Sequence, residues 1–425
     1  MNIGIFTDTY SPQVNGVVSS ILTLENMLRA QGHQVYIFTI SHPEAENDSP
    51  FVYRLASLPF VFLKDHRVGI VYSNKTLRKI KRLKLDLILS QTEFSLGIFA
   101  KLVSKRLHLP IIHTYHTMYE EYMHYVSKGI ELSPAIARRY SKSFCNGVDG
   151  VVAPTRKTER LLKKYGVKKP IRVIPTGIDF SPFNPEHYTG KEIDAIKKAH
   201  HIPLDSPVVL FIGRVAKEKS IDVLIDAMPK VLHQIPNAKL VIVGDGPSRL
   251  ELEEYAQQLG IREAVIFTGM HPWRTIGKMY QLGDVFVSAS VSETQGLTFA
   301  EAMAAKLPVL AREDECVVGL IRDHYNGAFF EDANSLSERL IEFLSDADAL
   351  KVMGQNAMHS IRPLSAEVFG LNAEAFYQEI VEDFKKQPRK KSKHHMLPFH
   401  KKTIATQDLK EDFLDLELSK TPKKL

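Results

Sequence analysis

Short apolar runs alternate with segments of helical periodicity along most of this chain, and this alternation is the strongest constraint on its fold. The first forty residues contain an apolar run over 2–8, apolar positions at helical spacing over 17–30, and a second apolar run over 34–40. Gly32 ends the helical segment. Such a unit joins two parallel strands, so the sequence predicts an α/β fold with a parallel sheet covered by helices on both faces.

The same rhythm occurs in two blocks. In the first block, further strands are predicted at 85–89, 111–114, 150–153 and 171–174. A stretch rich in Pro, Asn and charge, 181–207, is interpreted as a connection between domains. In the second block, strands are predicted at 208–212, 239–243, 264–268, 284–289 and 308–310, and helices at 221–233, 249–260, 273–282, 298–306, 334–344, 350–361 and 366–385. The chain is therefore expected to contain two doubly wound parallel sheets in series.

Composition excludes several classes of protein. With 44% apolar and 24% charged residues, most of the chain cannot be disordered. The two cysteines, Cys145 and Cys316, exclude a disulfide scaffold and have no zinc-ligand spacing. The sequence starts without a basic leader, and no apolar run reaches the roughly 18 residues that cross a bilayer. A cytoplasmic location is expected, either free or on a membrane surface.

The net charge of +6 is mild, but the cations cluster twice. One cluster, between 64 and 84, includes Lys75, Arg78, Lys79, Lys81, Arg82 and Lys84. The other extends from 385 to 402 without any acid, and the composition from 387 onward predicts a flexible basic tail. In the first cluster, leucine and isoleucine alternate with the cations, which is compatible either with a helix at an anionic membrane surface or with a plain solvated helix. No nucleic-acid-binding motif accompanies the cations.

Residues at the ends of predicted strands are candidates for ligand binding, because α/β sheets bind ligands at the carboxyl ends of their strands. Gly16 precedes the first helix, but no GxGxxG dinucleotide motif is present there. Arg214 and Lys219 follow the first strand of the second block, where they would suit a diphosphate or form an ordinary solvated loop.

Two acids follow the predicted strand 284–289, with Glu293 in a loop and Glu301 in the next helix. Such carboxylates can each accept hydrogen bonds from a pair of sugar hydroxyls, and backbone N–H groups of 296–298 can face phosphate. The alternative is a solvated loop acid and an acid that stabilises the helix N-terminus. Of two histidines near the end of the strand 111–114, His113 is expected to be structural, whereas His116 could contact a sugar or a reacting oxygen.

Together these residues resemble the retaining GT-B glycosyltransferases of glycosyltransferase family 4. The resemblance covers about residues 1–385 and rests on 8–16, 114–117, Gly213-Arg214 with Lys219, 243–247, and the E-x₇-E spacing of Glu293 and Glu301. It implies two Rossmann-like domains facing across a cleft. The expected domains are 1–180 for the acceptor and membrane side and 181–365 for the nucleotide sugar, with a helix over 366–386 that crosses back to the first domain and a basic tail over 387–425.

The resemblance implies sugar transfer from a nucleotide sugar with retention at the anomeric carbon, with no bound prosthetic group and no metal required. His116 and Glu293 are the implied catalytic residues beside the donor sugar, and Glu301 would hold the ribose. The implied donor-binding residues are Gly16, Arg214, Lys219, Gln295, Gly296, Leu297, Thr298 and Glu301. Two residues depart from the family pattern. Gln295 stands where the family often has Phe or Tyr, and Lys306 stands where Gly is common.

Within the family, the segments 5–17 and 113–122 look like those of bacterial diacylglycerol glucosyltransferases. The implied reaction is transfer of glucose from UDP-glucose to 1,2-diacylglycerol at the inner face of the cell membrane, with the nucleotide sugar, the lipid and an anionic membrane surface as partners. Other acceptors (a glycosylated lipid, a phosphoinositide) and other donors (UDP-galactose, GDP-mannose) remain open. So do a nucleotide-sugar epimerase of similar architecture and a non-catalytic membrane-binding module.

Overall fold

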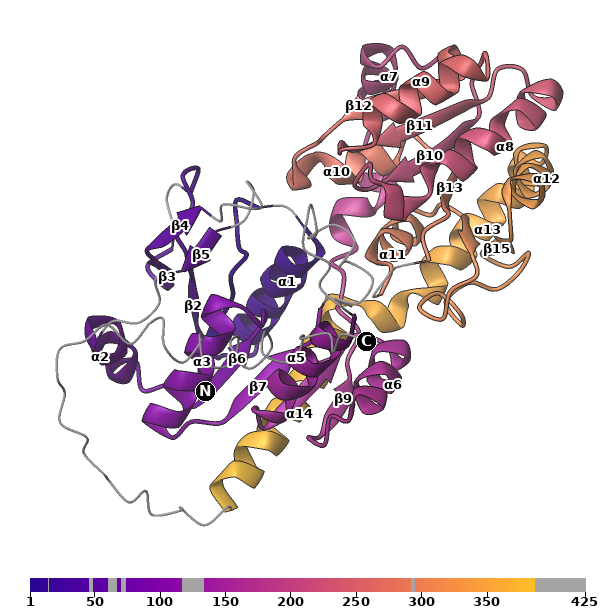
Figure 1. Ribbon diagram of the computed structural model, residues 1–425. Helices are drawn as coiled ribbons and strands as arrows, with labels where there is room; N and C mark the ends of the chain where they lie inside the picture. Colours follow the sequence, from indigo (N-terminus) through magenta and orange to yellow (C-terminus); the bar gives the residue numbers. More distant parts are fainter. Residues whose placement is uncertain are drawn as a thin grey trace, which may run out of the picture. The chain divides into compact units, whose positions relative to one another are not determined.

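The computed structural model of the chain describes residues 1–13, 15–45, 49–59, 67–69, 74–116, 134–291 and 295–386. Residues 1–385 form one compact unit that contains two parallel β-sheets (Figure 1). The predicted fold class is thereby confirmed. The predicted tail, 387–425, lies outside the described residues.

The first sheet has seven strands in the order β3-β2-β1-β6-β7-β8-β9, all of them paired in parallel. The strands are β1 (Asn2–Phe6), β2 (Gln34–Ile40), β3 (Val52–Leu55), β6 (Leu87–Ser90), β7 (Ile111–Thr114), β8 (Gly150–Ala153) and β9 (Ile171–Val173). A separate antiparallel ribbon pairs β4 (Ser57–Pro59) with β5 (Arg67–Gly69). The central strands are buried on both faces, which explains why they read as continuous apolar runs.

Helices cover both faces of this sheet. They are α1 (Gly16–Ala30), α2 (Asn74–Arg82), α3 (Ser95–Leu107), α5 (Pro134–Asn146) and α6 (Arg156–Tyr165). Two apolar cores result, one on each face, and the buried side chains of β1 alternate between them. Phe6 belongs to one core, and Ile3 and Ile5 belong to the other.

The second sheet has six parallel strands in the order β12-β11-β10-β13-β14-β15. They are β10 (Val208–Ile212), β11 (Lys239–Val243), β12 (Val265–Gly269), β13 (Val285–Ser288), β14 (Val309–Arg312) and β15 (Gly327–Phe330). The helices of this half are α7 (Gly190–Ala199), α8 (Ile221–Gln234), α9 (Arg249–Gln258), α10 (Trp273–Tyr280), α11 (Leu297–Ala304), α12 (Ala333–Leu344) and α13 (Ala347–Ser360). Again there is an apolar core on each face.

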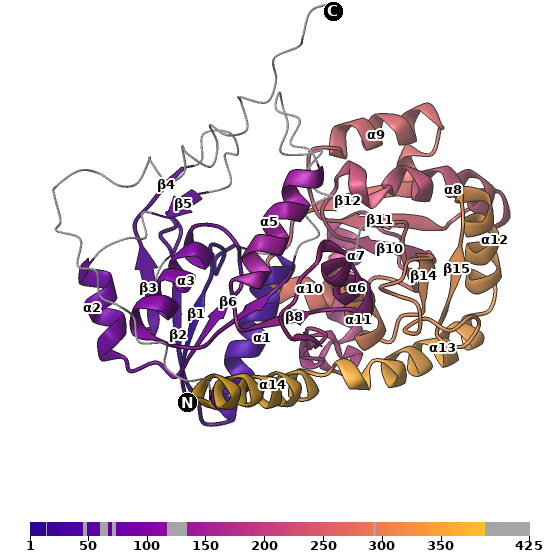
Figure 2. The ribbon, with the colours of Figure 1, turned by 60° about the horizontal axis from the view of Figure 1, so that its bottom comes forward.

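The last described helix, α14 (Ala366–Lys386), follows the second sheet in sequence but packs on the first. Its buried Phe376 and Ile380 belong to the core that contains Ile5. Glu374 contacts His33 just after α1, and the two helices lie side by side (Figure 2). The exact domain limits at 180 and 365 stay predictions.

The stretch 181–207, interpreted as a connection between domains, was predicted without a helix. The stretch contains α7, which begins with a reciprocal capping pair between Thr189 and Glu192. Four short strands, β3, β4, β5 and β15, were also not predicted; β4 and β5 have only three residues each, and β3 contains Arg54.

Candidate active site

Each sheet reverses its strand order at one point: between β1 and β6 in the first sheet, and between β10 and β13 in the second. Ligands of open α/β sheets bind outside the carboxyl ends of the strands at such a switch point. Asp8 and Gln91 follow β1 and β6, and His116 follows the neighbouring β7. Arg214 follows β10, and α11 follows β13. Most of the residues proposed from the sequence therefore lie at or beside the two switch points.

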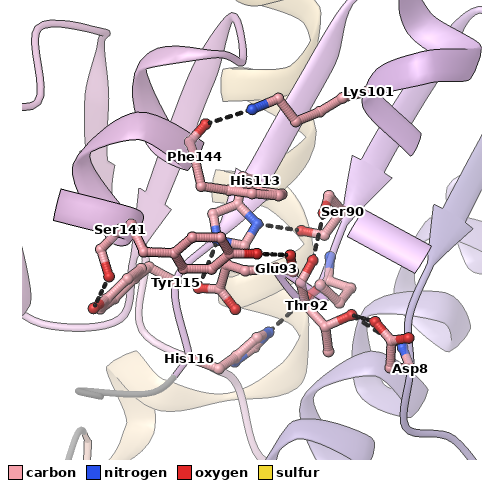
Figure 3. A network of polar contacts seen from close by, with 12 residues as sticks. Asp8, Ser90, Thr92, Glu93, Lys101, His113, Tyr115, His116, Ser141 and Phe144 are labelled. Atoms are coloured by element: carbon pink, nitrogen blue, oxygen red, sulfur yellow. Dashed lines mark hydrogen bonds and ion pairs between the residues drawn. The ribbon is translucent and has the colours of Figure 1, made fainter. Parts of the chain in front are cut away.

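At the first switch point, Asp8 connects β1 to the start of α3 (Figure 3). Its carboxylate accepts hydrogen bonds from the Thr92 hydroxyl at 2.6 Å and the Leu96 backbone N–H at 3.1 Å, and also from the Ser95 hydroxyl. Burial nevertheless raises the pKa of Asp8 above its usual value, against the lowering effect of these donors. Asp8 thus satisfies the free N–H groups of a helix start, so its role is structural.

His113 is fully buried on β7 and has a partner at each ring nitrogen. Nδ1 lies 3.0 Å from the Ser90 carbonyl oxygen, and Nε2 lies 3.1 Å from Oε1 of Glu93. Glu93 is itself only 2% exposed. The expectation that His113 is a structural residue agrees with this geometry.

His116 lies just beyond β7, is half-buried, and points toward the loop that follows β6 (Figure 3). Its Nε2 is 2.8 Å from Oε1 of Gln91, a side chain that is 2% exposed. Burial, assisted by the neighbouring His113, lowers the pKa of His116 to about 3. The imidazole is therefore neutral at physiological pH and suited to hydrogen bonding rather than to carrying charge.

Gly16 is the exposed first residue of α1, and Asn15 caps this helix by accepting the N–H of Val18. A Cβ atom built on Gly16 would lie 3.6 Å from Cδ1 of Leu297, the first residue of α11. The two glycine-led helix starts, one from each half of the chain, therefore lie next to each other. Helix starts carry free N–H groups and partial positive charge, which favour anions.

Arg214 and Lys219 lie in the segment after β10. Arg214 is exposed, and no other side chain in the described part of the chain forms an ion pair with it. Lys219 is half-buried at the end of a short 3-10 turn, Lys217–Lys219. Arg214 is thus an exposed cation at a switch point, a position suited to an anionic ligand.

Helix α11 begins after Gly296, whose φ of +73° is the left-handed conformation that glycine tolerates. Leu297 and Thr298 occupy the first turn, so their N–H groups have no partner within the helix. Glu301 lies one turn further and is 6% exposed. Its Oε2 accepts a hydrogen bond of 2.7 Å from the buried Tyr280 hydroxyl, and burial raises the pKa of Glu301 to about 7.

Gln295 has both ends of its amide occupied by the backbone of Thr176. Its Oε1 accepts the Thr176 N–H at 2.7 Å, and its Nε2 donates to the Thr176 carbonyl at 2.9 Å. The Thr176 hydroxyl is hydrogen-bonded to that of Ser20 on α1 at 2.9 Å. In this arrangement Gln295 fixes the approach to α11 against the segment after β9, and its amide is not directed at a ligand. Glu293 lies outside the described residues.

The basic cluster forms α2 and the turn after it. Lys75, Arg78, Lys79, Lys81, Arg82 and Lys84 are all exposed. The aliphatic residues between them face inward, because Ile80 is fully buried, Leu85 is 5% exposed, and Leu77 and Leu83 pack on the same core. The aliphatic side chains of this segment therefore belong to the core of the first half, and its cations form the outer face.

The sequence patterns missed Gln91, Glu93, Thr176 and Tyr280. Gln91 and Glu93 follow a predicted strand just as His116 does, so polar residues after β6 were an available signal. Thr176 and Tyr280 had no such signal, because their partners Gln295 and Glu301 are 119 and 21 residues away. In the described ranges no cluster of His, Cys, Asp or Glu is arranged to bind a metal. No described helix is long and apolar enough to span a membrane.

Comparisons with known proteins agree on the family. The model described as Glycosyltransferase Family 4 matches residues 14–181, and the one described as Glycosyl transferases group 1 matches residues 192–360. An alpha-monoglucosyldiacylglycerol synthase of Streptococcus pneumoniae is 37% identical over 90% of this chain and 86% of its own length. A protein of the same name from Acholeplasma laidlawii is 33% identical over 92% of this chain and 100% of its own length.

Solved structures agree on the fold. Alr3699/HepE of Anabaena, in complex with UDP and glucose, has a TM-score of 0.71 at 16% identity and covers 89% of this chain and 100% of its own. Sucrose-phosphate synthase of Thermosynechococcus elongatus has a TM-score of 0.70 at 22% identity, covering 90% and 99%. Because two relatives above 30% identity extend over nearly its whole length, this chain belongs to glycosyltransferase family 4 and has the GT-B fold.

Proposed function

We propose that this enzyme transfers glucose from UDP-glucose to 1,2-diacylglycerol and produces α-monoglucosyldiacylglycerol at the cytoplasmic face of the cell membrane. The observation that carries the proposal is the similarity, over about nine-tenths of the chain, to two synthases named for this product. Structural neighbours with UDP or UDP-glucose bound support a uridine nucleotide as donor.

For the donor, we assign the diphosphate to Arg214, Lys219 and the first N–H groups of α11. A guanidinium and an ammonium supply the positive charge that stabilises a leaving diphosphate. Glu301 is assigned to the ribose, because the carboxylate has one oxygen bound to Tyr280 and a second oxygen for a ribose hydroxyl. Gly16 is assigned to the other side of the phosphate, where the absence of a side chain leaves room beside Leu297. Gln295, which was expected to contact the donor, is instead assigned to positioning this loop.

For the transfer itself, His116 and Glu293 are assigned to the donor sugar. In a retaining transfer, the bond between the anomeric carbon and the diphosphate oxygen breaks, and the acceptor oxygen bonds to the same face of that carbon. The proton of the acceptor hydroxyl passes to the departing phosphate, so the enzyme needs no separate carboxylate base. In this scheme the chain's residues bind and orient the reactants, which is a large part of transfer catalysis.

A lipid acceptor is supported by apolar side chains beside the polar network at the first switch point. Phe94 and Ile98, at the start of α3, are 52% and 55% exposed, and Tyr140 on α5 is 38% exposed. The Tyr140 hydroxyl donates to the carbonyl of Glu93, which places α5 beside that network. Exposed apolar groups next to a polar site suit an acceptor with one reactive hydroxyl and two hydrocarbon chains.

The reaction is tested by offering radiolabelled UDP-glucose, UDP-galactose and GDP-mannose with diacylglycerol in mixed micelles, with and without a chelator. A chelator-resistant product from UDP-glucose supports the donor, the acceptor and metal independence together. Transfer only to a glycosylated lipid or a phosphoinositide would favour those acceptors, and loss with chelator would contradict metal independence. UDP binding without transfer to any acceptor would favour a GT-B protein of another activity, such as an epimerase.

Attachment to the membrane is assigned to the cations of α2. Each cation near an anionic surface contributes about 1 kcal/mol, so replacing Lys79, Lys81 and Arg82 with Gln should weaken vesicle binding by about 100-fold. As a matched control, Lys191, Lys198 and Lys351, three exposed cations of the second half, are replaced in the same way. Equal losses in the two triple variants, measured by vesicle sedimentation, would contradict a specific role for α2.

A further inference from the structure

The two histidines at the end of β7 have different kinds of partner. Both ring nitrogens of His113 lie against oxygen atoms, the Ser90 carbonyl oxygen and a carboxyl oxygen of Glu93. The Glu93 carboxyl group thus contacts the fully buried His113. His116 instead faces an amide, because its Nε2 lies 2.8 Å from Oε1 of Gln91.

The Gln91 contact determines where the proton of His116 lies. An amide oxygen can only accept a hydrogen bond, so Nε2 of His116 carries the proton. In a neutral imidazole the other nitrogen, Nδ1, then has a free lone pair. No hydrogen bond joins Nδ1 to another residue in the described part of the chain, so this nitrogen remains an acceptor.

We propose that Gln91 is a positioning residue that holds His116 as the neutral Nε2–H tautomer, so that Nδ1 accepts a hydrogen bond from a hydroxyl group of the donor sugar. The sugar part of this inference rests on the proposed function. The tautomer part does not, because it concerns the protein alone.

The burial of Gln91 supports this role. The side chain is 2% exposed, and its Nε2 has no hydrogen-bond partner in the described ranges. A buried amide nitrogen without a partner destabilises a fold, and an apolar side chain of similar size would avoid that cost. Stability therefore does not account for an amide at this position, whereas its bond to His116 does.

The surroundings keep His116 neutral. The titratable groups of this network include His113 and Tyr115 on and beside β7, Glu93 after β6, Asp8 after β1, Lys101 on α3 (Figure 3) and Tyr140 on α5. Burial and the neighbouring His113 lower the pKa of His116 to about 3. A carboxylate in place of the Gln91 amide would act in the opposite direction, because it would favour the imidazolium.

The tautomer is measured first, on the full chain without substrate. Histidine labelled with ¹⁵N gives two-bond proton–nitrogen correlations that distinguish the tautomers, and a His116→Asn variant identifies the signals. The expected result is a neutral Nε2–H ring whose shifts do not change between pH 5.5 and 8.5. A ring protonated at Nδ1, or one that titrates in this range, would overturn the proposal even if the enzyme transfers glucose as proposed.

The Gln91 variants then test the link to the sugar. In Gln91→Glu, the pKa of His116 should rise, so kcat/KM for UDP-glucose should fall about tenfold per pH unit below the new pKa, because an imidazolium cannot accept a hydrogen bond. The affinity for UDP, which has no sugar to contact, should change less than twofold. In Gln91→Leu, the new side chain has neither a charge nor a hydrogen-bond acceptor, so His116 should be a mixture of the two neutral tautomers. The loss of kcat/KM should then not depend on pH.

The matched control is Gln257→Glu, which adds the same charge at an exposed position on α9. It should leave the His116 signals and the pH profile unchanged. If Gln91→Glu instead keeps the wild-type pH profile while the NMR signals show a protonated ring, His116 does not accept a bond from the sugar. If the wild-type chain does not use UDP-glucose at all, the proposed function fails, and the NMR result still decides the tautomer.

Discussion

The carboxyl edges of the two sheets are built in different ways. At the first sheet, polar side chains are buried or half-buried and hydrogen-bonded: Gln91 pairs with His116, Glu93 with His113, and Asp8 with Thr92. At the second sheet, Arg214 is exposed, and the start of α11 carries free backbone N–H groups. A buried network fixes the direction of neutral hydrogen-bonding groups, whereas open cations and N–H groups attract an anion.

This difference suits a nucleotide sugar, because each sheet edge would bind a different part of it. The first edge would orient the neutral sugar and the acceptor, and the second edge would supply most of the binding energy for the charged nucleotide. The meeting of Gly16 with Leu297, and the pairing of Gln295 with Thr176, join the two edges. Variants of the two edges should therefore affect UDP and UDP-glucose differently.

The largest effect is expected for Arg214→Ala. Loss of a charge-assisted hydrogen bond costs about 1.5–3 kcal/mol, which weakens UDP binding by about 10- to 150-fold in calorimetric titrations. The control is Lys217→Ala, an exposed cation of the same segment. Unchanged UDP affinity in Arg214→Ala would remove the assigned diphosphate role.

His116→Ala should affect the sugar and not the nucleotide. We expect kcat/KM for UDP-glucose to fall by roughly 10- to 100-fold through loss of orientation, with UDP affinity unchanged. The measurement is steady-state kinetics beside UDP titration. An equal loss of UDP affinity would contradict the division between the two edges.

Gly16→Ala should change the affinity for UDP-glucose without lowering the stability of the fold. The added methyl would lie 3.6 Å from Leu297, an ordinary contact, so the melting temperature should stay the same or rise slightly. UDP-glucose affinity should nevertheless fall about tenfold, because the methyl occupies space assigned to the phosphate. Gly190→Ala, at the first residue of α7 with no atom within 4 Å, is the control and should change neither quantity. Wild-type affinity in Gly16→Ala would place the phosphate elsewhere.

The smallest effect is expected for the pH dependence of UDP affinity. The pKa of Glu301 is raised to about 7, so its carboxylate is lost as the pH falls through this value. The ionised carboxylate accepts a hydrogen bond from a ribose hydroxyl, so the affinity of the wild type for UDP should rise severalfold from pH 6 to pH 8. The rise should be smaller in Glu301→Gln, which has no carboxylate at this position. Glu251→Gln on α9 is the exposed control and should behave like the wild type. Identical pH curves for wild type and Glu301→Gln would contradict the ribose contact.

The sequence predicted most elements of the fold, because buried parallel strands are continuous apolar runs with helices between them. The strands at 34–40, 111–114, 150–153 and 239–243 have the predicted limits. Strand ends also pointed to His116 and Arg214. The sequence could not provide the partners of these residues, since Gln91 comes from a neighbouring strand and Thr176 pairs with a residue 119 positions away. Nor could it show whether the apolar face of α2 packs on the core or lies at a membrane, because Leu77 and Ile80 alternate with cations in both cases.

Glucosyl transfer to diacylglycerol with retention can be decided from the structure of the product. The purified chain is incubated with UDP-glucose labelled with ¹³C at the anomeric carbon and vesicles of diacylglycerol with anionic lipid, and the extracted lipid is analysed by NMR. We expect α-linked monoglucosyldiacylglycerol. A β-linked product would contradict retention, and free glucose or an unlabelled lipid fraction would contradict diacylglycerol as the acceptor.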